Sequence, residues 1–230
     1  MTTITVLGDR NPDWITHRAL DATLALLPEG IDARWAPTDT PLDDLGDGLW
    51  IAPGSPYRDD DAVMAAIARA RAERVPLLGT CGGFQYILLA LAGLDLGDHG
   101  ESTPDAAAPL VAPLPCRVDG EWRPVTPVPG TMLASLLGVE PFAGLFFCGY
   151  APRPDAADRI ARAGGVIAAH ADGVGPVALE VPDGEPFVMA TLFHVQIGAL
   201  DGEPLSPVIA AFAQAARAHA REAPAEAAAS

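Results

Sequence analysis

A cysteine set between glycines is the residue best placed to do chemistry in this sequence. Gly79-Thr80-Cys81-Gly82-Gly83 follows an apolar run and precedes a helix-forming stretch. This is the pattern of a nucleophile elbow, in which the glycines permit a tight strand-to-helix turn that exposes the central side chain. At a helix N-terminus the unpaired N–H groups and the dipole favour a thiolate and would lower the cysteine pKa. We therefore predict that Cys81 is a nucleophile; the plainer interpretation is a small buried apolar side chain.

A thiol that attacks a carbonyl carbon also needs oxyanion donors and a base. The backbone N–H of Gly82, directly after the nucleophile, is one natural donor. The segment Pro53-Gly54-Ser55-Pro56 would be only a turn if it stood alone. It follows a strand that should neighbour the elbow strand, so the N–H of Gly54 or Ser55 is the candidate for the second donor. Among the five histidines, His194 stands at the end of an apolar strand, and we predict it as the base rather than as a structural histidine.

Alternating strands and helices are expected to position these residues. Strands are predicted over residues 3–8, 32–37, 48–52 and 75–80. Helices are predicted over about 15–27, from about 59 to a point before Pro76, and over 82–90. This alternation is typical of βαβ units and favours an α/β fold, a doubly wound, mostly parallel sheet with flanking helices. Ligands of such sheets bind beyond the carboxyl ends of the strands. The loops that carry Gly54 and Cys81 should therefore face one crevice.

The second half of the chain is predicted in less regular terms. Residues 95–109 are expected to form an irregular excursion. Strands are predicted over 111–118, 124–128 and 144–150, with a short helix over 130–137. Residues 177–181 and 187–193 flank a Pro- and Gly-containing turn and indicate a C-terminal β-hairpin. Ser206-Pro207 opens a final helix to about residue 219. We expect one domain over residues 1–220 and a disordered tail over 221–230.

Composition excludes several classes of function. Half of the 230 residues are apolar, 19% are charged and the formal net charge is −16, which argues against disorder, nucleic-acid binding and anionic membranes. No signal peptide and no spanning segment is predicted. Three widely spaced cysteines form neither a disulfide framework nor a metal pair. We expect a cytoplasmic protein that binds no metal and no cofactor.

The motifs resemble those of a known enzyme family. Gly79-Thr80-Cys81-Gly82-Gly83-Phe84-Gln85 resembles the nucleophile motif of class I glutamine amidotransferases, and Leu192-Phe193-His194-Val195-Gln196 stands where that family carries His-Pro-Glu. Pro53-Gly54-Ser55-Pro56-Tyr57-Arg58 is similar to the oxyanion strand of the glutaminase domain of CTP synthase. Leu7-Gly8-Asp9-Arg10-Asn11-Pro12 and Cys148-Gly149-Tyr150-Ala151-Pro152 resemble free-standing proteins related to that glutaminase region, some of which carry selenocysteine at the nucleophile position.

The resemblance implies a fold and a set of roles. It implies a cysteine that attacks the carboxamide of glutamine, releases ammonia and forms a thioester that water hydrolyses. Cys81 would be the nucleophile, His194 the base and Gly54 with Gly82 the oxyanion donors. Further residues are implied to hold the substrate; these are Ser55, Gln85, Tyr150 and, for the amino group, Glu101, with Asp105 in the same region.

The sequence departs from the family pattern at several points. Gln196 replaces the glutamate, so an amide rather than a carboxylate would orient the imidazole. Phe147-Cys148-Gly149 replaces the basic residues that grip the α-carboxylate of glutamine. The chain also has no Gly-x-x-x-x-Gly-Lys-Ser/Thr phosphate loop, so an enzyme that accepts the ammonia would act in trans.

These departures leave three hypotheses open. The leading one is a cysteine hydrolase, with Gln196 in the catalytic set, that acts on glutamine or another small carboxamide. The second is a binding or regulatory module that kept the fold and lost the triad. The third is a thiol redox role for Cys81 with Cys148, which would need the two Cα atoms within about 7 Å; packing is the plainer interpretation of Cys148. The oligomeric state stays open, with a homodimer among the options.

Overall fold

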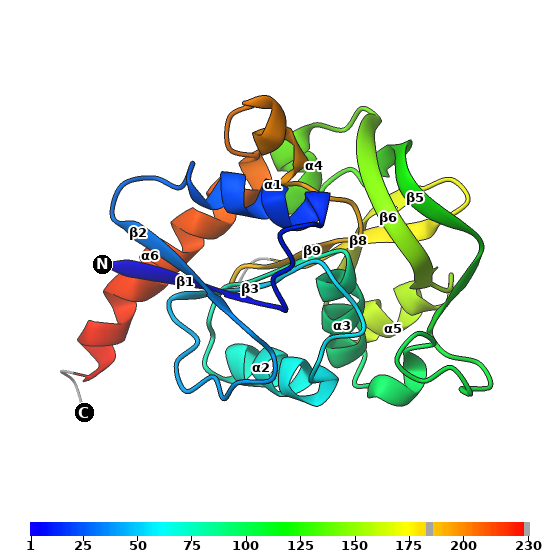
Figure 1. Cartoon of the computed structure of the whole chain (residues 1–230), viewed down its shortest axis with the longest axis horizontal. Helices are drawn as coiled ribbons and strands as arrows, with labels where there is room; N and C mark the ends of the chain where they lie inside the picture. The colour runs from blue at the N-terminus through cyan, green and yellow to red at the C-terminus, as the bar shows by residue number, and fades with distance from the viewer. Residues whose placement is uncertain (183–185, 228–230) are drawn as a thin grey trace.

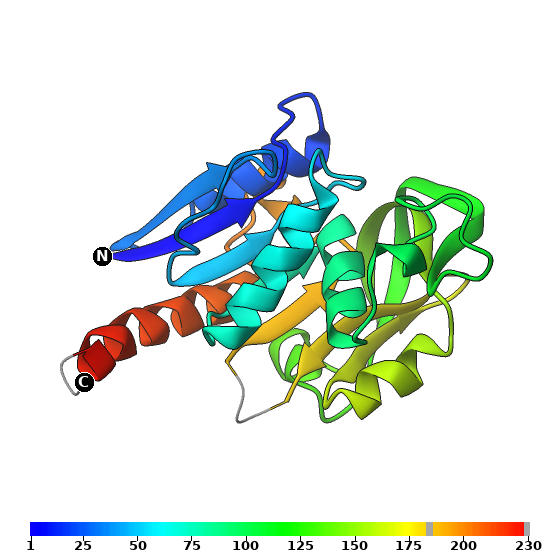
Figure 2. The same ribbon diagram turned by 90° about the horizontal axis from the view of Figure 1, so that it is seen from below.

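The computed structural model describes residues 1–182 and 186–227, and these form a single nine-stranded sheet with helices on both faces (Figures 1 and 2). The strands are β1 (Thr2–Leu7), β2 (Ile31–Ala36), β3 (Gly48–Ile51), β4 (Leu77–Thr80), β5 (Val111–Pro127), β6 (Phe142–Pro152), β7 (Val166–Ala171), β8 (Gly175–Val181) and β9 (Val188–Thr191). The helices are α1 (Ile15–Leu24), α2 (Asp60–Ala72), α3 (Gly82–Leu91), α4 (Met132–Leu137), α5 (Ala156–Arg162) and α6 (Pro207–Ala227), with 3₁₀ turns η1 (Leu96–Asp98) and η2 (Ile197–Asp201).

The strand order is β2-β1-β3-β4-β9-β8-β7-β5-β6. The pairs from β2 to β9 are parallel, and those from β9 to β6 are antiparallel. The predicted α/β fold is confirmed, and so is the hairpin of β8 and β9, whose turn residues 183–185 lie outside the described residues. The antiparallel part extends beyond that hairpin to three further strands.

The parallel half is built as the sequence predicts. β4 is buried along its whole length, as expected of a parallel strand covered on both faces. α2 begins where the Asp59 carboxylate accepts a hydrogen bond from the backbone N–H of Ala62 at 2.8 Å, with further acidic residues in the first turn. α2 and α3 cover one face of the sheet, and α1, α4 and α6 cover the other (Figures 1 and 2).

The second half differs from the prediction in three places. The two strands predicted over 111–118 and 124–128 are one long strand, β5, whose register shifts twice against β6, once around Gly120 at φ 71°. These bulges break the alternation of side chains, which explains why the sequence suggested two strands. α5 and β7 were not predicted, because β7 is rich in alanine, which has a low strand propensity. α6 continues to Ala227 rather than ending near residue 219.

The core joins both halves of the sheet. Its largest fully buried side chains include Trp50, Phe84, Phe146 and Phe212, which come from β3, α3, β6 and α6. In the described part of the chain, no helix has the length and apolar character needed to cross a membrane.

Candidate active site

Cys81 occupies a strained turn between β4 and α3. Its backbone has φ 56° and ψ −112°, a conformation that costs a non-glycine residue free energy and is typical of nucleophile elbows. A Cβ atom at Gly82 would collide with the carbonyl oxygen of Gly54, and one at Gly83 would collide with the carbonyl oxygen of Ile51. Only glycine therefore permits the β3 loop to approach the elbow this closely. The Cys81 N–H also donates to the Thr191 carbonyl at 2.8 Å, which ties the elbow to β9.

The sulfur of Cys81 lies among backbone groups. Its thiol donates to the carbonyl oxygen of Phe147 on β6 at 3.4 Å. Burial raises the pKa of the Cys81 thiol to about 11, and hydrogen bonds from the backbone N–H groups of Gly82 and Gly54 partly oppose that rise. The lowered pKa that the sequence suggested is therefore wrong, because the loss of solvent outweighs the helix N-terminus. Gly54, which follows β3, and Gly82, which begins α3, approach each other closely at the elbow.

His194 and Gln196 lie in the segment that follows β9. Both are almost fully buried, and the Gln196 amide lies 3.2 Å from Nδ1 of His194. Burial lowers the pKa of His194 to about 3, with a smaller contribution from His17, so the imidazole is neutral at pH 7. Among the described residues, Nε2 of His194 has no hydrogen-bond partner. The amide nitrogen of Gln196 faces Nδ1 and can only donate, so in this arrangement the proton of the neutral ring lies on Nε2. Turning the amide by 180° would bring Oε1 of Gln196, which has no partner among the described residues, to accept from an Nδ1–H, and Nε2 would then be free to act as a general base.

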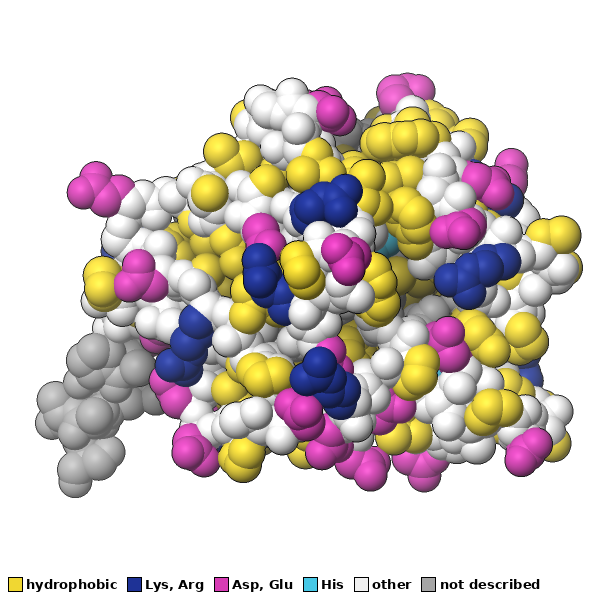
Figure 3. All heavy atoms as spheres, viewed as in Figure 1, with side chains coloured by type: hydrophobic (Ala, Val, Ile, Leu, Met, Phe, Trp, Pro, Cys, Tyr) yellow, Lys and Arg dark blue, Asp and Glu magenta, His cyan; other side chains and the backbone are white. Residues whose placement is uncertain are grey.

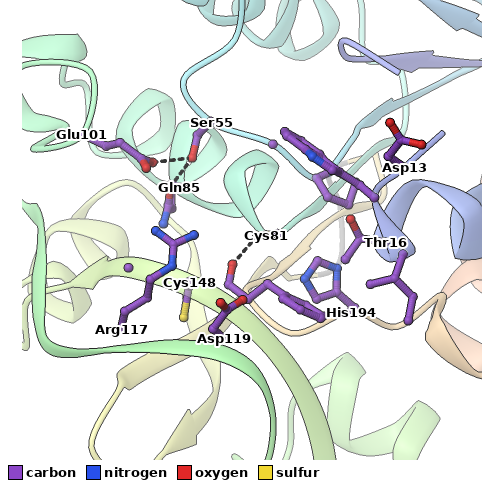
Figure 4. Close-up of a pocket in the computed structure, with 16 residues that line it drawn as sticks. Asp13, Thr16, Ser55, Cys81, Gln85, Glu101, Arg117, Asp119, Cys148 and His194 are labelled. Carbon is purple, nitrogen blue, oxygen red and sulfur yellow. Dashed lines mark hydrogen bonds between the residues drawn. The ribbon is translucent and has the colours of Figure 1, made fainter. Parts of the chain in front are cut away.

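A pocket of about 460 Å³ opens over the elbow and contains both Cys81 and His194. Figure 3 shows this face of the molecule hollowed between α1 and the β5–β6 side. Figure 4 shows the side chains from β5 and β6 opposite those of the α1 segment. The lining residues are Asp13, Trp14, Ile15, Thr16, Pro53, Gly54, Ser55, Cys81, Gln85, Glu101, Arg117, Asp119, Phe147, Cys148, Gly149 and His194.

Three of the four predicted substrate-binding residues line this pocket. Ser55 donates to Glu101 at 2.6 Å and to Gln85 at 3.4 Å (Figure 4). Burial raises the pKa of the Glu101 carboxyl, whereas the Ser55 hydrogen bond lowers it. Tyr150 is not among the lining residues; its carbonyl accepts a hydrogen bond from the Gln85 amide at 2.9 Å. Asp105, the other carboxylate considered for the amino group, does not line the pocket either.

Arg117 is the site residue that sequence reasoning missed. It is the one arginine or lysine among the described residues that line the pocket. A Cβ atom at Gly149 would lie 3.4 Å from Nη1 of Arg117, so the guanidinium occupies space that a side chain at position 149 would take. In Figure 4 it points toward Gln85. No local motif marks Arg117, because its position depends on the bulged register of β5 against β6.

The remaining cysteines occupy contrasting environments. Cys148 is buried in the pocket wall, and burial raises its pKa to about 12, with the Cys81 thiolate as a further cause. Both thiols are free. Cys116, which the sequence left as structural, is exposed. In the described ranges, no group of three or more His, Cys, Asp or Glu side chains is arranged to hold a metal ion.

Comparison with known proteins finds relatives that match most of this chain. No protein-family model matches it. It is 32% identical over 175 residues to CTP synthase of Aeropyrum pernix and 30% identical over 190 residues to CTP synthase of Archaeoglobus fulgidus, matches that cover 70% and 76% of this chain. These matches cover 32% and 35% of the two relatives, so the chain spans about a third of their length. Its homology to CTP synthase lies in the glutaminase region.

Solved structures of low identity share the fold. The glutaminase domain of Trypanosoma brucei CTP synthase, solved with bound acivicin, has a TM-score of 0.73 and 17% identity, with 94% of each chain covered. A putative GMP synthase subunit from Thermoplasma acidophilum has a TM-score of 0.68 and 18% identity, with 97% of this chain and 98% of that one covered. This chain has the class I glutamine amidotransferase-like fold. It is the fold that the resemblance in the sequence implied.

The structure shows what surrounds the two positions at which the sequence departs from the pattern of class I glutamine amidotransferases, Gln196 and the segment before Tyr150. Gln196 stands beside His194 as an orienting amide. The basic residue expected before Tyr150 is absent from β6, and Gly149 leaves room there for Arg117 from β5. The site therefore has a cation on the neighbouring strand, although position 149 itself has no side chain.

Proposed function

We propose that this protein is a cysteine amidohydrolase of the glutamine amidotransferase type. The observation that carries the proposal is the close approach of Gly54 and Gly82 at the strained turn of Cys81, beside the pocket that holds His194, with backbone N–H groups of both glycines lowering the pKa of the thiol. Donors placed in this way would stabilise the oxyanion of a tetrahedral adduct, and losing one such donor typically costs about 10²–10³ in rate. A cysteine that only filled space would need neither the strained turn nor these donors.

The chemistry would proceed from a neutral thiol and a neutral imidazole. With the Gln196 amide turned so that its oxygen accepts from Nδ1–H of His194, Nε2 is unprotonated, and the thiol proton passes to Nε2 as Sγ bonds to the carboxamide carbon. His194 then gives that proton to the departing nitrogen, which leaves as ammonia, and a thioester remains. Water next loses a proton to His194 as its oxygen attacks the thioester, and Sγ takes the proton back as the carboxylic acid leaves. Because burial raises the pKa of Cys81 and lowers that of His194, proton transfer during attack replaces a preformed ion pair.

Arg117 and Glu101 support a substrate with an amino-acid head group. Arg117 is the lining cation, and Glu101 is a half-buried carboxylate beside Ser55. The electrostatic effect of Arg117 reaches Glu101, where it lowers the carboxyl pKa against the effect of burial. A carboxylate bound at Arg117 and an ammonium bound at Glu101 would fix a zwitterion, with its side-chain amide directed toward Cys81. We therefore propose L-glutamine or a close relative as substrate.

The released ammonia needs an acceptor. We propose a separate enzyme in trans that consumes the ammonia, as the similarity to one region of CTP synthase and to a putative GMP synthase subunit supports. A partner of this kind would protect ammonia from loss to solvent.

Ammonia release from L-glutamine by wild-type protein, Cys81→Ala and His194→Ala tests the proposal. We expect turnover by wild type, none by Cys81→Ala and a loss of at least about 10²-fold in His194→Ala. A Cys116→Ser background removes the exposed thiol without touching the pocket. Mass spectrometry should trap a thioester on Cys81. Ammonia release by Cys81→Ala at the wild-type rate would refute the assignment.

One observation favours the alternative of a binding module. The sulfur of Cys81 contacts the Phe147 carbonyl, and Nε2 of His194 has no partner among the described residues, so the two groups are not hydrogen-bonded to each other. A binding module would take up L-glutamine, protect Cys81 from alkylation and form no thioester. The same experiments therefore separate the two functions.

A further inference from the structure

A buried histidine on α1 has no part in the proton transfers described above. His17 is fully buried, and it follows the Asp13–Thr16 segment that lines the pocket. Its Nδ1 accepts a hydrogen bond from the backbone N–H of Asn11 at 2.8 Å, and its Nε2 lies 2.8 Å from the carbonyl oxygen of Pro53. A backbone N–H can only donate and a carbonyl can only accept. The ring is therefore neutral, with its proton on Nε2, and that proton is donated to Pro53.

The Pro53 carbonyl belongs to the same peptide unit as the N–H of Gly54. A trans peptide is planar, and its C=O and N–H point in opposite directions. Holding the carbonyl at His17 consequently turns the Gly54 N–H away from His17. Gly54 and Cys81 line the same pocket, and the Gly54 N–H lowers the pKa of the Cys81 thiol, which opposes the effect of burial. Gly54 has φ +123°, a conformation open to glycine, so the backbone on its own permits this peptide unit to rotate.

The surroundings of His17 hold the ring in one orientation. It packs against Trp14 and Trp35, with ring centroids 5.0 and 5.2 Å away. Burial lowers the pKa of His17, so the ring keeps the neutral form that accepts from Asn11. The same helix contacts the base segment, because the Thr23 hydroxyl donates to the Gln196 carbonyl at 3.2 Å. Helix α1 is therefore hydrogen-bonded both to Pro53, in the segment after β3, and to Gln196, in the segment after β9.

We propose that His17 is a positioning residue that holds the Pro53–Gly54 peptide with its N–H directed at the oxyanion of the Cys81 adduct. This inference rests on the proposed function, because it assigns the Gly54 N–H to the oxyanion. His17 itself touches neither substrate nor nucleophile. Its effect should appear in steps that form a tetrahedral adduct and be absent from direct displacement at the sulfur.

Two substitutions at position 17 separate the two hydrogen bonds. The amide nitrogen of glutamine reaches the place of Nε2, so His17→Gln keeps the donor to Pro53 and loses the acceptor for Asn11. The shorter asparagine reaches only the place of Nδ1, so His17→Asn keeps the acceptor and loses the donor. Both variants replace the ring with a smaller amide, and thermal melts of the two should show comparable losses of stability.

The rates of two reactions at Cys81 provide the readout, in a Cys116→Ser background. Acylation by p-nitrophenyl acetate passes through a tetrahedral oxyanion, whereas alkylation by iodoacetamide does not. We expect His17→Asn to lower the acylation rate by about 10- to 100-fold, as for a displaced active-site group. Its alkylation rate should stay within about threefold of wild type. His17→Gln should restore acylation to within about threefold.

Distinct outcomes would overturn the two proposals. Equal acylation rates in His17→Asn and His17→Gln, or a parallel loss of acylation and alkylation in His17→Asn, would show that His17 is only structural, while the proposed function would stand. If Cys81→Ala reacted with the ester as fast as wild type, the nucleophile assignment and this inference would both fail.

Discussion

Neutralising Arg117 tests how the pocket recognises its substrate. The side chain is exposed, and no ion pair to it is found among the described residues. Its Nη1 lies over the backbone of Gly149, 3.4 Å from the place of a Cβ atom. Arg117→Gln therefore removes a charge that faces the pocket and breaks no internal ion pair. The folded state should lose little stability, and the effect should fall on ligand binding.

The expected magnitude follows from the exposure of the guanidinium. Unit charges about 4 Å apart at an effective dielectric constant of about 20 attract by about 4 kcal/mol. Because Arg117 is exposed, solvent screens much of that attraction. Hydrogen bonds to charged groups contribute about 1.5–3 kcal/mol net, and the lower part of that range is appropriate here. A loss of about 1.5–2 kcal/mol corresponds to weaker binding of the carboxylate by about 10- to 30-fold.

Protection of Cys81 from iodoacetamide measures this binding without requiring turnover. The assay compares L-glutamine with L-glutaminol, which has a hydroxymethyl group in place of the carboxylate, in a Cys116→Ser background at about pH 9. Arg117→Gln should raise the half-protecting concentration of L-glutamine by about 10- to 30-fold and leave that of L-glutaminol within about twofold. Arg123→Gln is the matched control, because Arg123 lies on the same strand, pairs with Glu121 and does not line the pocket.

Two results would refute this reasoning. If Arg117→Gln weakened L-glutamine and L-glutaminol equally, the guanidinium would shape the pocket without recognising a carboxylate. If neither constant changed, while Arg117→Gln and Arg123→Gln behaved alike, the carboxylate would lie elsewhere.

Two further predictions concern stability and the elbow. His194 and His99 have folded-state pKa values of about 3 and about 4 because of burial, below the unfolded value of about 6.5, so their stabilising contribution is present above pH 6.5 and is lost as pH falls. Between pH 7.5 and pH 5, protonation of each histidine in the unfolded state should lower the free energy of unfolding by about 2 kcal/mol. The raised pKa of Glu101 should offset part of this loss. Urea titrations that gave equal stability at both pH values would contradict this prediction. Gly82→Ala places a Cβ atom against the Gly54 carbonyl. We expect the variant to lose about 1–3 kcal/mol of unfolding free energy and its rate of ester acylation to fall by at least about 100-fold. Acylation at the wild-type rate would disprove the close approach of the two segments.

Local sequence was sufficient to predict the elbow and the elements around it. A tight strand-to-helix turn needs glycines at fixed positions relative to the nucleophile, and the five residues around Cys81 contain them. The same holds for α2, whose N-cap at Asp59 is a local hydrogen bond. The parallel half of the sheet followed from the alternation of apolar strands and amphipathic helices. These features depend on neighbours within a few residues, so a single sequence is enough to reveal them.

Long-range packing decided the rest of the site. Arg117 reaches the pocket only because a bulged β5 pairs with β6 and Gly149 leaves space for it. His17 meets Pro53 across 36 positions of sequence, and no motif joins them. Tertiary structure also decided the direction in which the pKa of Cys81 shifts. The sequence identified a helix N-terminus, which lowers the pKa, whereas burial by the surrounding fold raises it by more. Solvent exclusion depends on every segment that covers a group, so the folded chain alone determines it.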